Sequence, residues 1–111
     1  MTPLDDASLE AVRRLARRAQ DLVEHNRLTR HQRIALRLTS LTASDAEQMI
    51  AEAKMVVQRW RQEKLCSMDY IERWSAMLSL SPADLAEAMV SDAEGWGIAL
   101  RQNSPWVGLD D

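Results

Sequence analysis

The sequence predicts an all-α protein, a compact bundle of five or six helices with a short irregular C-terminal tail. The first observation is composition, since the 111 residues include only three glycines and three prolines and many residues that favour helices. The second is that apolar residues recur at spacings of three and four along most of the chain. The third is that no stretch alternates apolar and polar residues long enough to predict a strand. The length suits one domain over residues 1–111, with a tail over 103–111.

The first apolar series predicts an amphipathic helix over about residues 5–25. Its members form one stripe: Leu9, Val12, Leu15, Ala16, Ala19, Leu22 and Val23. Small side chains in the middle of the stripe, Ala16 and Ala19, let another helix approach closely. That helix belongs either to the same chain or to a second copy.

A polar stretch follows this helix and predicts a break in the chain. The ten residues 24–33 contain one apolar side chain, Leu28, and a capping-box spacing begins at Thr29. We therefore predict a junction near residues 26–29 and a second helix over about 30–40. One continuous helix that runs to Ser40 is the alternative.

Serine residues at capping positions predict where the later helices begin. The predicted helices cover about 45–65 after Ser44, about 68–79 after Ser67, a short segment after Ser81-Pro82, and about 92–102 after Ser91. The last of these contains Gly95-Trp96-Gly97, and glycine is costly inside a helix. Two glycines around a tryptophan indicate a break or a close approach of the backbone to another element.

The sequence contains none of the motifs that carry common enzyme chemistry, such as a glycine-rich phosphate loop or a metalloprotease helix. His25 and His31 lie six residues apart and are predicted to be surface residues, too few to ligate a metal. We therefore predict no enzyme, no metal and no cofactor. Cys66 is the only cysteine, and residues 1–10 carry three acids and no basic residue, which favours a cytoplasmic protein over a secreted one.

The formal net charge of −3 conceals an uneven distribution. Residues 11–40 contain eight arginines against two acids, which gives +6. Residues 65–111 contain two arginines against eight acids, which gives −6. This split favours a basic face that meets an acidic face on a second copy or on another protein.

The basic segment also predicts an alternative function, in which arginines replace the counterions of a nucleic acid. The arginines of this alternative surface are Arg13, Arg14, Arg17, Arg18, Arg30, Arg33 and Arg37. A solvated helix face with local pairs such as Glu10–Arg14 and Arg17–Asp21 explains the same pattern without a ligand.

The aromatic residues gather in the later part of the chain: Trp60, Tyr70, Trp74, Trp96 and Trp106. Trp60 and Trp74 fall on inward stripes and are predicted to be core residues. We predict that Trp96, Trp106 and Val107 bind a partner, because tryptophan often anchors protein interfaces. The alternative for Trp106 is that it docks on its own domain.

Together these observations predict a small, non-catalytic, cytoplasmic helical protein that acts through protein–protein interaction. Its size and charge layout favour a bacterial antitoxin-like or inhibitor-like regulator with a protein partner or a second copy as a homodimer. A nucleic-acid-binding regulator that uses the basic face of residues 13–37 is the alternative. No apolar run is long enough to span a membrane, so no membrane partner is expected.

Overall fold

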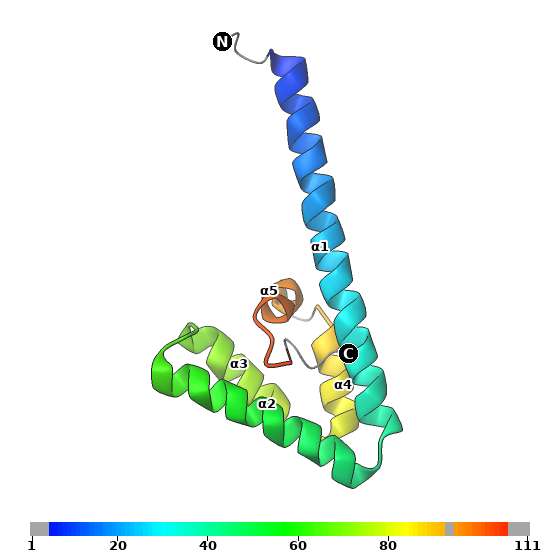
Figure 1. Cartoon of the computed structure of the whole chain (residues 1–111), viewed down its shortest axis with the longest axis vertical. Helices are drawn as coiled ribbons and strands as arrows, with labels where there is room; N and C mark the ends of the chain where they lie inside the picture. The colour runs from blue at the N-terminus through cyan, green and yellow to red at the C-terminus, as the bar shows by residue number, and fades with distance from the viewer. Residues whose placement is uncertain (1–4, 93–94, 107–111) are drawn as a thin grey trace.

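The computed structural model describes residues 5–92 and 95–106, and every regular element in these residues is a helix (Figure 1). The order is α1 (Asp6–Ser40), α2 (Ala43–Glu63), α3 (Met68–Leu78), α4 (Pro82–Val90) and α5 (Gly97–Gln102). The predicted all-α class is therefore confirmed. The described part of the predicted tail, 103–106, is irregular.

α1 is one continuous helix, so the predicted junction near residues 26–29 is wrong and the alternative is correct. Asp5 caps its start, where the carboxylate accepts a hydrogen bond from the Ser8 backbone N–H at 2.7 Å. The helix continues through the polar stretch because His31, also expected on the surface, is buried on the inner side in place of an apolar residue.

The residues that cap the N-termini of α2 and α4 can be compared with the serine caps that the sequence predicts. Thr42, and not the predicted Ser44, caps α2, because its hydroxyl accepts a hydrogen bond from the Asp45 N–H at 3.2 Å. Ser81 caps α4 as predicted, and Pro82 occupies the first turn, where its missing N–H costs nothing.

α5 begins at Gly97 and not near residue 92 as predicted. The two glycines around Trp96 interrupt the predicted helix. The Gly97 N–H donates to the Asp92 side chain at 3.0 Å, and a Cβ at Gly97 would collide with the backbone oxygen of Ser91. Gly95 has a φ of +76°, a conformation that favours glycine. The motif is therefore a break with a close backbone approach, as its glycines predict.

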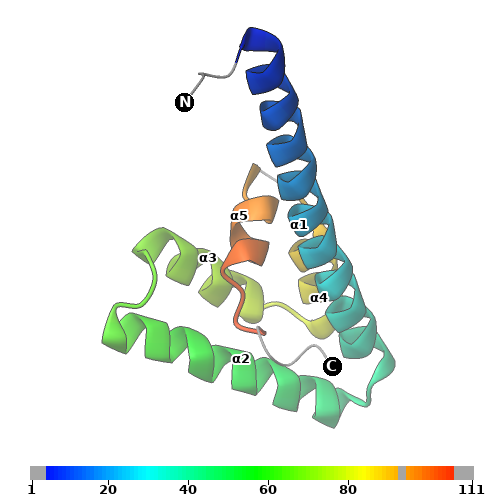
Figure 2. The ribbon, with the colours of Figure 1, turned by 45° about the horizontal axis from the view of Figure 1, so that its top comes forward.

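The core lies where the C-terminal part of α1 packs against α4 and α5, with α2 and α3 paired beside them (Figure 2). Trp74 and Trp106 meet edge to face at its centre, with ring centroids 5.6 Å apart. The Trp74 indole N–H donates to the Asn103 carbonyl at 2.7 Å, which fixes the chain after α5. This arrangement ties the C-terminal turn to the middle of the bundle.

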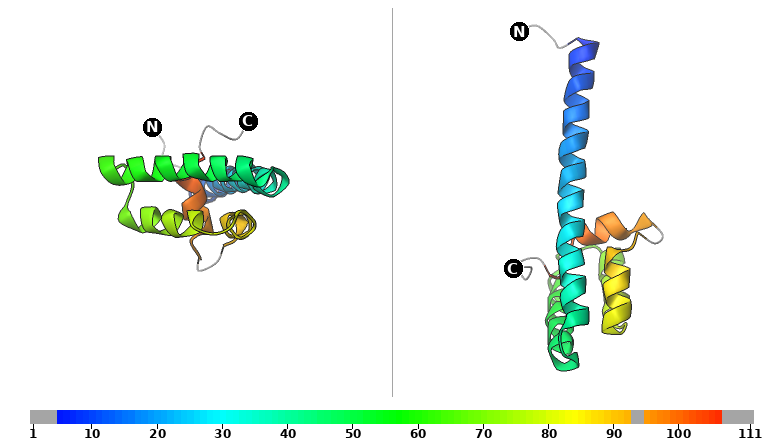
Figure 3. Two further views of the ribbon diagram at one scale, coloured as in Figure 1. Left: turned by 90° about the horizontal axis from the view of Figure 1, so that it is seen from below. Right: turned by 90° about the vertical axis from the view of Figure 1, so that its right-hand side faces the viewer.

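The N-terminal part of α1 extends beyond this bundle, as Figure 3 shows from the side. The longest extent of the molecule is 61 Å and its radius of gyration is 17.5 Å, against about 13 Å for a compact chain of this length. We call residues 6–26 the projecting half of α1 and residues 27–40 its packed half. The bundle of the packed half and the other helices is called the body.

Candidate functional site

The projecting half carries an apolar stripe that the body does not cover. Val12, Leu15 and Leu22 are 52%, 62% and 59% exposed, whereas Leu38 in the packed half is 1% exposed. We define the projecting stripe by the residues that the sequence places on one side of the helix: Leu9, Val12, Leu15, Ala16, Ala19, Leu22 and Val23. An apolar face of this kind on a soluble helix marks a surface for another apolar face.

The stripe shares one edge with the face of α1 that the body covers. With about 100° of rotation per residue, Ala16, Val23 and Ile34 lie within about 20° of one another around the axis. Ile34 is buried in the core, whereas Ala16 and Val23 are exposed. The two faces therefore overlap at one edge, while Leu15 and Leu22 lie about a quarter of a turn or more away from the buried side of the packed half.

The spacing along the stripe is that of a coiled-coil seam. Successive seam residues alternate in steps of three and four: Leu9, Val12, Ala16, Ala19 and Val23. The same series reaches the N-cap residue Asp5, four residues before Leu9, and passes through the polar Asn26 to Arg30. An acid therefore stands at one end of the apolar seam and a base at the other.

Charged side chains of the projecting half pair with each other on its flank. Glu10 lies 3.8 Å from both Arg13 and Arg17, rather than pairing with Arg14 as the sequence predicts. Further along, the Gln20 amide donates to the Glu24 carboxylate at 3.1 Å. These exposed pairs contribute little to stability, about 0–1 kcal/mol each at most, but they leave the stripe itself apolar.

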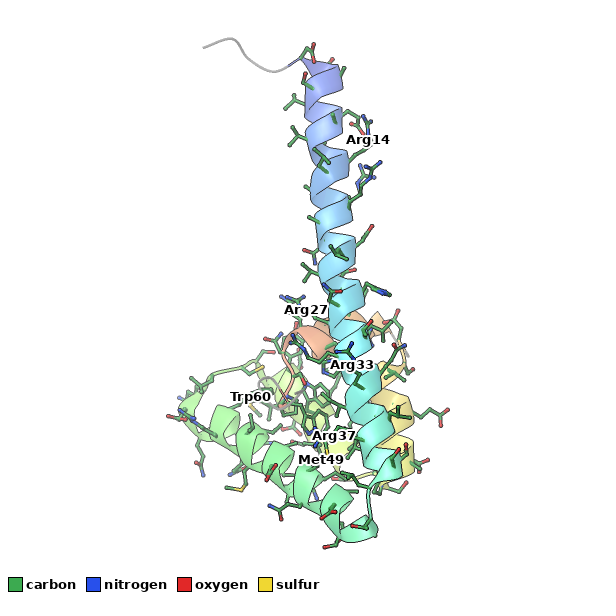
Figure 4. The ribbon with its side chains drawn as sticks, turned by 45° about the vertical axis from the view of Figure 1, so that its right-hand side comes forward. Arg14, Arg27, Arg33, Arg37, Met49 and Trp60 are labelled. Atoms are coloured by element: carbon green, nitrogen blue, oxygen red, sulfur yellow. The ribbon has the colours of Figure 1, made fainter. Side chains whose placement is uncertain are left out.

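The arginines of the alternative nucleic-acid surface do not share one face. Helical geometry places the group Arg13–Arg18 roughly half a turn away from the group Arg30–Arg37. Figure 4 shows Arg14 high on the projecting half, whereas Arg33 and Arg37 lie beside the body. The expected single basic face over residues 13–37 is therefore corrected to two groups on different sides of α1.

The predicted partner-binding residues lie in the body. Trp106 is fully buried, so its side chain belongs to the core and is closed to a partner. Its indole N–H is buried without a hydrogen-bond acceptor among the described residues. Val107 lies outside the described residues. The structure thus favours the docking of Trp106 on its own domain.

Trp96 is half-buried and remains accessible from one side. Its ring packs edge to face against Tyr70, with centroids 5.7 Å apart, and the Arg73 guanidinium carbon lies 4.2 Å from the ring centroid. A shallow groove beside it is lined by Met77 and Leu100. Trp96 therefore forms a second, smaller apolar surface at the α3–α5 side of the body.

His31 lies near the start of the packed half of α1 and contacts the C-terminal turn. Its Nδ1 lies 2.7 Å from the Arg27 carbonyl oxygen and its Nε2 lies 2.8 Å from the Ser104 hydroxyl, which also accepts from the Trp106 N–H at 3.2 Å. His25, six residues earlier, is exposed. The two histidines are therefore kept apart, and His31 acts as a structural link to the C-terminal turn.

These surfaces expose apolar and charged side chains. Among residues 5–92 and 95–106, no group of three or more histidines, cysteines or acids is placed to hold a metal ion. None of the described helices has both the length and the apolar character needed to cross a bilayer. Comparison with protein-family models, curated proteins and solved structures found no match to this chain.

The sequence predicted the stripe and left open whether a helix of the same chain or of a second copy covers it. Periodicity identifies an apolar face and does not identify what covers it. The spacing does not separate the stripe from a core stripe, because the buried residues of α2 also recur at steps of three and four and include two alanines: Ala46, Met49, Ile50, Ala53 and Val57. Exposed apolar side chains therefore gather on the projecting half of α1, whereas Trp106 of the predicted tail is buried.

Proposed function

We propose that this chain is a non-catalytic protein that acts through protein–protein contacts, and that the projecting stripe is its contact surface. The observation that carries the proposal is the exposure of Val12, Leu15 and Leu22 on a helix whose other half is buried. Leaving large apolar side chains in water gives up about 1.5–3 kcal/mol for each one. A partner that covers them recovers this energy.

The mode of contact follows from the shape of the surface. A single helix that extends from a folded body offers a narrow apolar face, which suits another helix or a hydrophobic groove. The flanking charges of Glu10, Arg13 and Arg17 set orientation and association rate, whereas the apolar residues supply affinity. Trp96 and its groove give the body a second apolar contact.

In the form we favour, the protein is a small bacterial regulator of an antitoxin-like or inhibitor-like kind that works in the cytoplasm, as a homodimer or with a different protein. Its mechanism is occlusion, in which the chain covers a surface of its partner. The acidic residues 65–111 would neutralise a basic surface while apolar groups anchor the contact. Size, charge layout and the single Cys66 support this form.

The experiment compares two variants that add the same charge to exposed apolar positions. The tagged chain is captured from the cells that make it as wild type, as Leu15→Glu/Leu22→Glu and as Met55→Glu/Met68→Glu, where Met68 is 53% exposed at the start of α3. Met55 is 72% exposed on α2, and this pair serves as the matched control outside the stripe. Glutamate favours helix, so both variants should melt as the wild type does.

We expect the stripe variant to lose the captured partner by about tenfold or more and the Met55→Glu/Met68→Glu variant to retain it. Identification of that partner by mass spectrometry then shows in which cellular process the protein acts. Retention of every captured protein by Leu15→Glu/Leu22→Glu would refute the stripe as the contact surface.

A second candidate is nucleic-acid binding through the arginine group Arg13–Arg18, because these four side chains are exposed on the flank and far side of the projecting half. A labelled duplex should then shift at low salt and dissociate steeply as salt rises. Absence of a shift with several duplexes at low salt removes this candidate, and the protein-contact proposal expects that absence.

A further inference from the structure

We infer that the occupant of the projecting stripe is a second copy of this chain, paired antiparallel along residues 6–26. The inference rests on the proposed function, since both use the same stripe, and it adds the identity and the direction of the partner helix. It draws on the seam spacing, the order of charges along α1, and the residues at the two ends and the middle of the seam.

The projecting half is long enough for a two-helix contact. Its 21 residues extend about 31 Å at 1.5 Å per residue, which covers three heptads of the seam. Shorter isolated helices are marginal in water, and pairing of apolar faces is what stabilises helices of this length. Two copies placed side by side over residues 6–26 keep their bodies at opposite ends of the pair only if they run antiparallel.

The charges of the chain alternate in blocks over residues 5–30, the part that the pair brings together. From the N-terminus, acids give −3, bases +4, acids −2 and bases +2: Asp5, Asp6 and Glu10; Arg13, Arg14, Arg17 and Arg18; Asp21 and Glu24; Arg27 and Arg30. A parallel pair in register would place each block beside an identical block, which is repulsive. An antiparallel pair centred near residues 17–18 places the first acidic block near Arg27 and Arg30, and Arg13 and Arg14 near Asp21 and Glu24, whereas Arg17 and Arg18 of the two copies meet at the centre.

The charged residues at the two ends of the seam also favour an antiparallel pair. Asp5 and Arg30 stand at opposite ends of one seam, and both are exposed. When two seams run antiparallel about residues 17–18, Asp5 of each copy faces Arg30 of the other. The carboxylate that caps α1 in one copy thus comes close to a guanidinium of the other at each end, a charge pairing that a parallel dimer cannot form.

The middle of the seam allows the close approach that this alignment needs. In the same register, Ala16 of one copy faces Ala19 of the other, and Val12 faces Val23. The smallest side chains thus oppose each other at the centre, with branched ones on either side. This complementarity follows from a single register and needs no change in α1, which is already a continuous helix there.

The first experiment measures mass against concentration by sedimentation equilibrium, because an elongated chain misleads a sizing column. We expect the mass to rise from the 12.6 kDa of one chain towards twice that value. Ala16→Glu should weaken the self-association about a hundredfold, because it buries an unpaired carboxylate at the centre of the seam.

The matched control is Ala7→Glu, on the same helix. Ala7 and Ala16 are both exposed and lie nine residues apart, hence on opposite sides of α1. Ala7→Glu should dimerise like the wild type, and both variants should keep the helix content of the wild type. A dimer that survives Ala16→Glu unchanged overturns the inference.

The second experiment tests direction by disulfide formation in a Cys66→Ser background. A mixture of Val12→Cys chains and Val23→Cys chains should cross-link to each other on mild oxidation. Neither variant alone should cross-link, because identical positions then lie about 16 Å apart along the seam, beyond the reach of a disulfide. Efficient cross-linking of Val12→Cys with itself means a parallel pair and overturns the antiparallel inference.

The two proposals fail separately. A chain that stays monomeric at every concentration, with stripe-dependent capture of a different protein, overturns the self-pairing and leaves the proposed function standing. A chain that dimerises through Ala16 and captures nothing in a stripe-dependent way supports the self-pairing and counts against the wider regulatory function.

Discussion

The two halves of α1 share one continuous helix, and each carries an apolar face, but they have different surroundings. In the packed half, Ile34 and Leu38 are almost completely buried against α4 and α5. In the projecting half, Leu15 and Leu22 are more than half exposed. The pattern of apolar residues is therefore a property of the helix, whereas burial is a property of what lies next to it.

The comparison also explains why the projecting half is helical at all. Starting an isolated helix is costly, and each further residue added to an existing helix costs little. The packed half supplies that start, since it is held by the core and by the contact between His31 and Ser104. Asp5 satisfies the exposed backbone at the other end. The projecting half therefore depends on the body for its structure and is available for a partner.

The largest expected effect comes from removing the centre of the body. Trp106→Ala deletes a fully buried ring that packs on Trp74, and we expect a loss of about 3–5 kcal/mol in the free energy of unfolding. Because the projecting half depends on the body, its helix should melt in the same transition, followed by circular dichroism in urea. Trp60→Ala, at a half-buried site, is the control and should cost clearly less.

A matched pair of leucine substitutions tests the comparison directly. Leu38→Ala in the packed half should lower the free energy of unfolding by about 2–5 kcal/mol, because it leaves a cavity in the core. Leu15→Ala in the projecting half should change it by less than about 0.5 kcal/mol when measured at a concentration where the chain is monomeric. Equal losses for the two variants would mean that the body or the rest of the chain covers the stripe in solution.

The boundary between the halves provides a third prediction. Ser104→Ala removes the hydroxyl that contacts the His31 ring and accepts a hydrogen bond from the backbone N–H of Trp106. The loss leaves buried polar groups without partners, so we expect about 1–3 kcal/mol of destabilisation. Ser44→Ala, at an exposed position that does not cap α2, should be neutral in the same urea titration. A neutral Ser104→Ala would mean that the packed half holds without this link.

The helix boundaries that depend on neighbouring residues could be predicted from the sequence. The start of α4 follows from Ser81-Pro82, and the break before α5 follows from Gly95 and Gly97. Each depends on a cap, a fixed φ or a close contact within a few residues. Such causes act through neighbouring residues and are visible in a single sequence.

The continuity of α1 and the burial of Trp106 could not be predicted in the same way. His31 makes its contact with Ser104, 73 residues later, so the sequence around His31 looks like a polar junction. Trp106 is buried because Trp74 and the chain around it form its pocket. Likewise, the stripe was predictable and its exposure was not, since exposure depends on where the other helices lie.

The smallest expected effect lies at the tip of the projecting half. The hydrogen bond from the Ser8 backbone N–H lowers the pKa of Asp5 below its ordinary value of 3.8. A lowered carboxyl pKa stabilises the folded state above the ordinary pKa, and that contribution is lost as pH falls through the folded-state pKa. We therefore expect the first turn of α1 to fray as pH falls below 3.8, while the packed half keeps its structure.

Hydrogen exchange and the chemical shift of the Ser8 amide report this fraying residue by residue. Asp5→Asn keeps a capping oxygen and removes the titration, so the Ser8 signal should then stay constant over the same acid range. An unchanged titration in Asp5→Asn would assign the effect to other acids, of which Glu10 is the nearest paired one. Confinement of the change to the first turn would show that the tip of the helix opens independently of the body, because the solvent-exposed cap and the core are joined only by the helix itself.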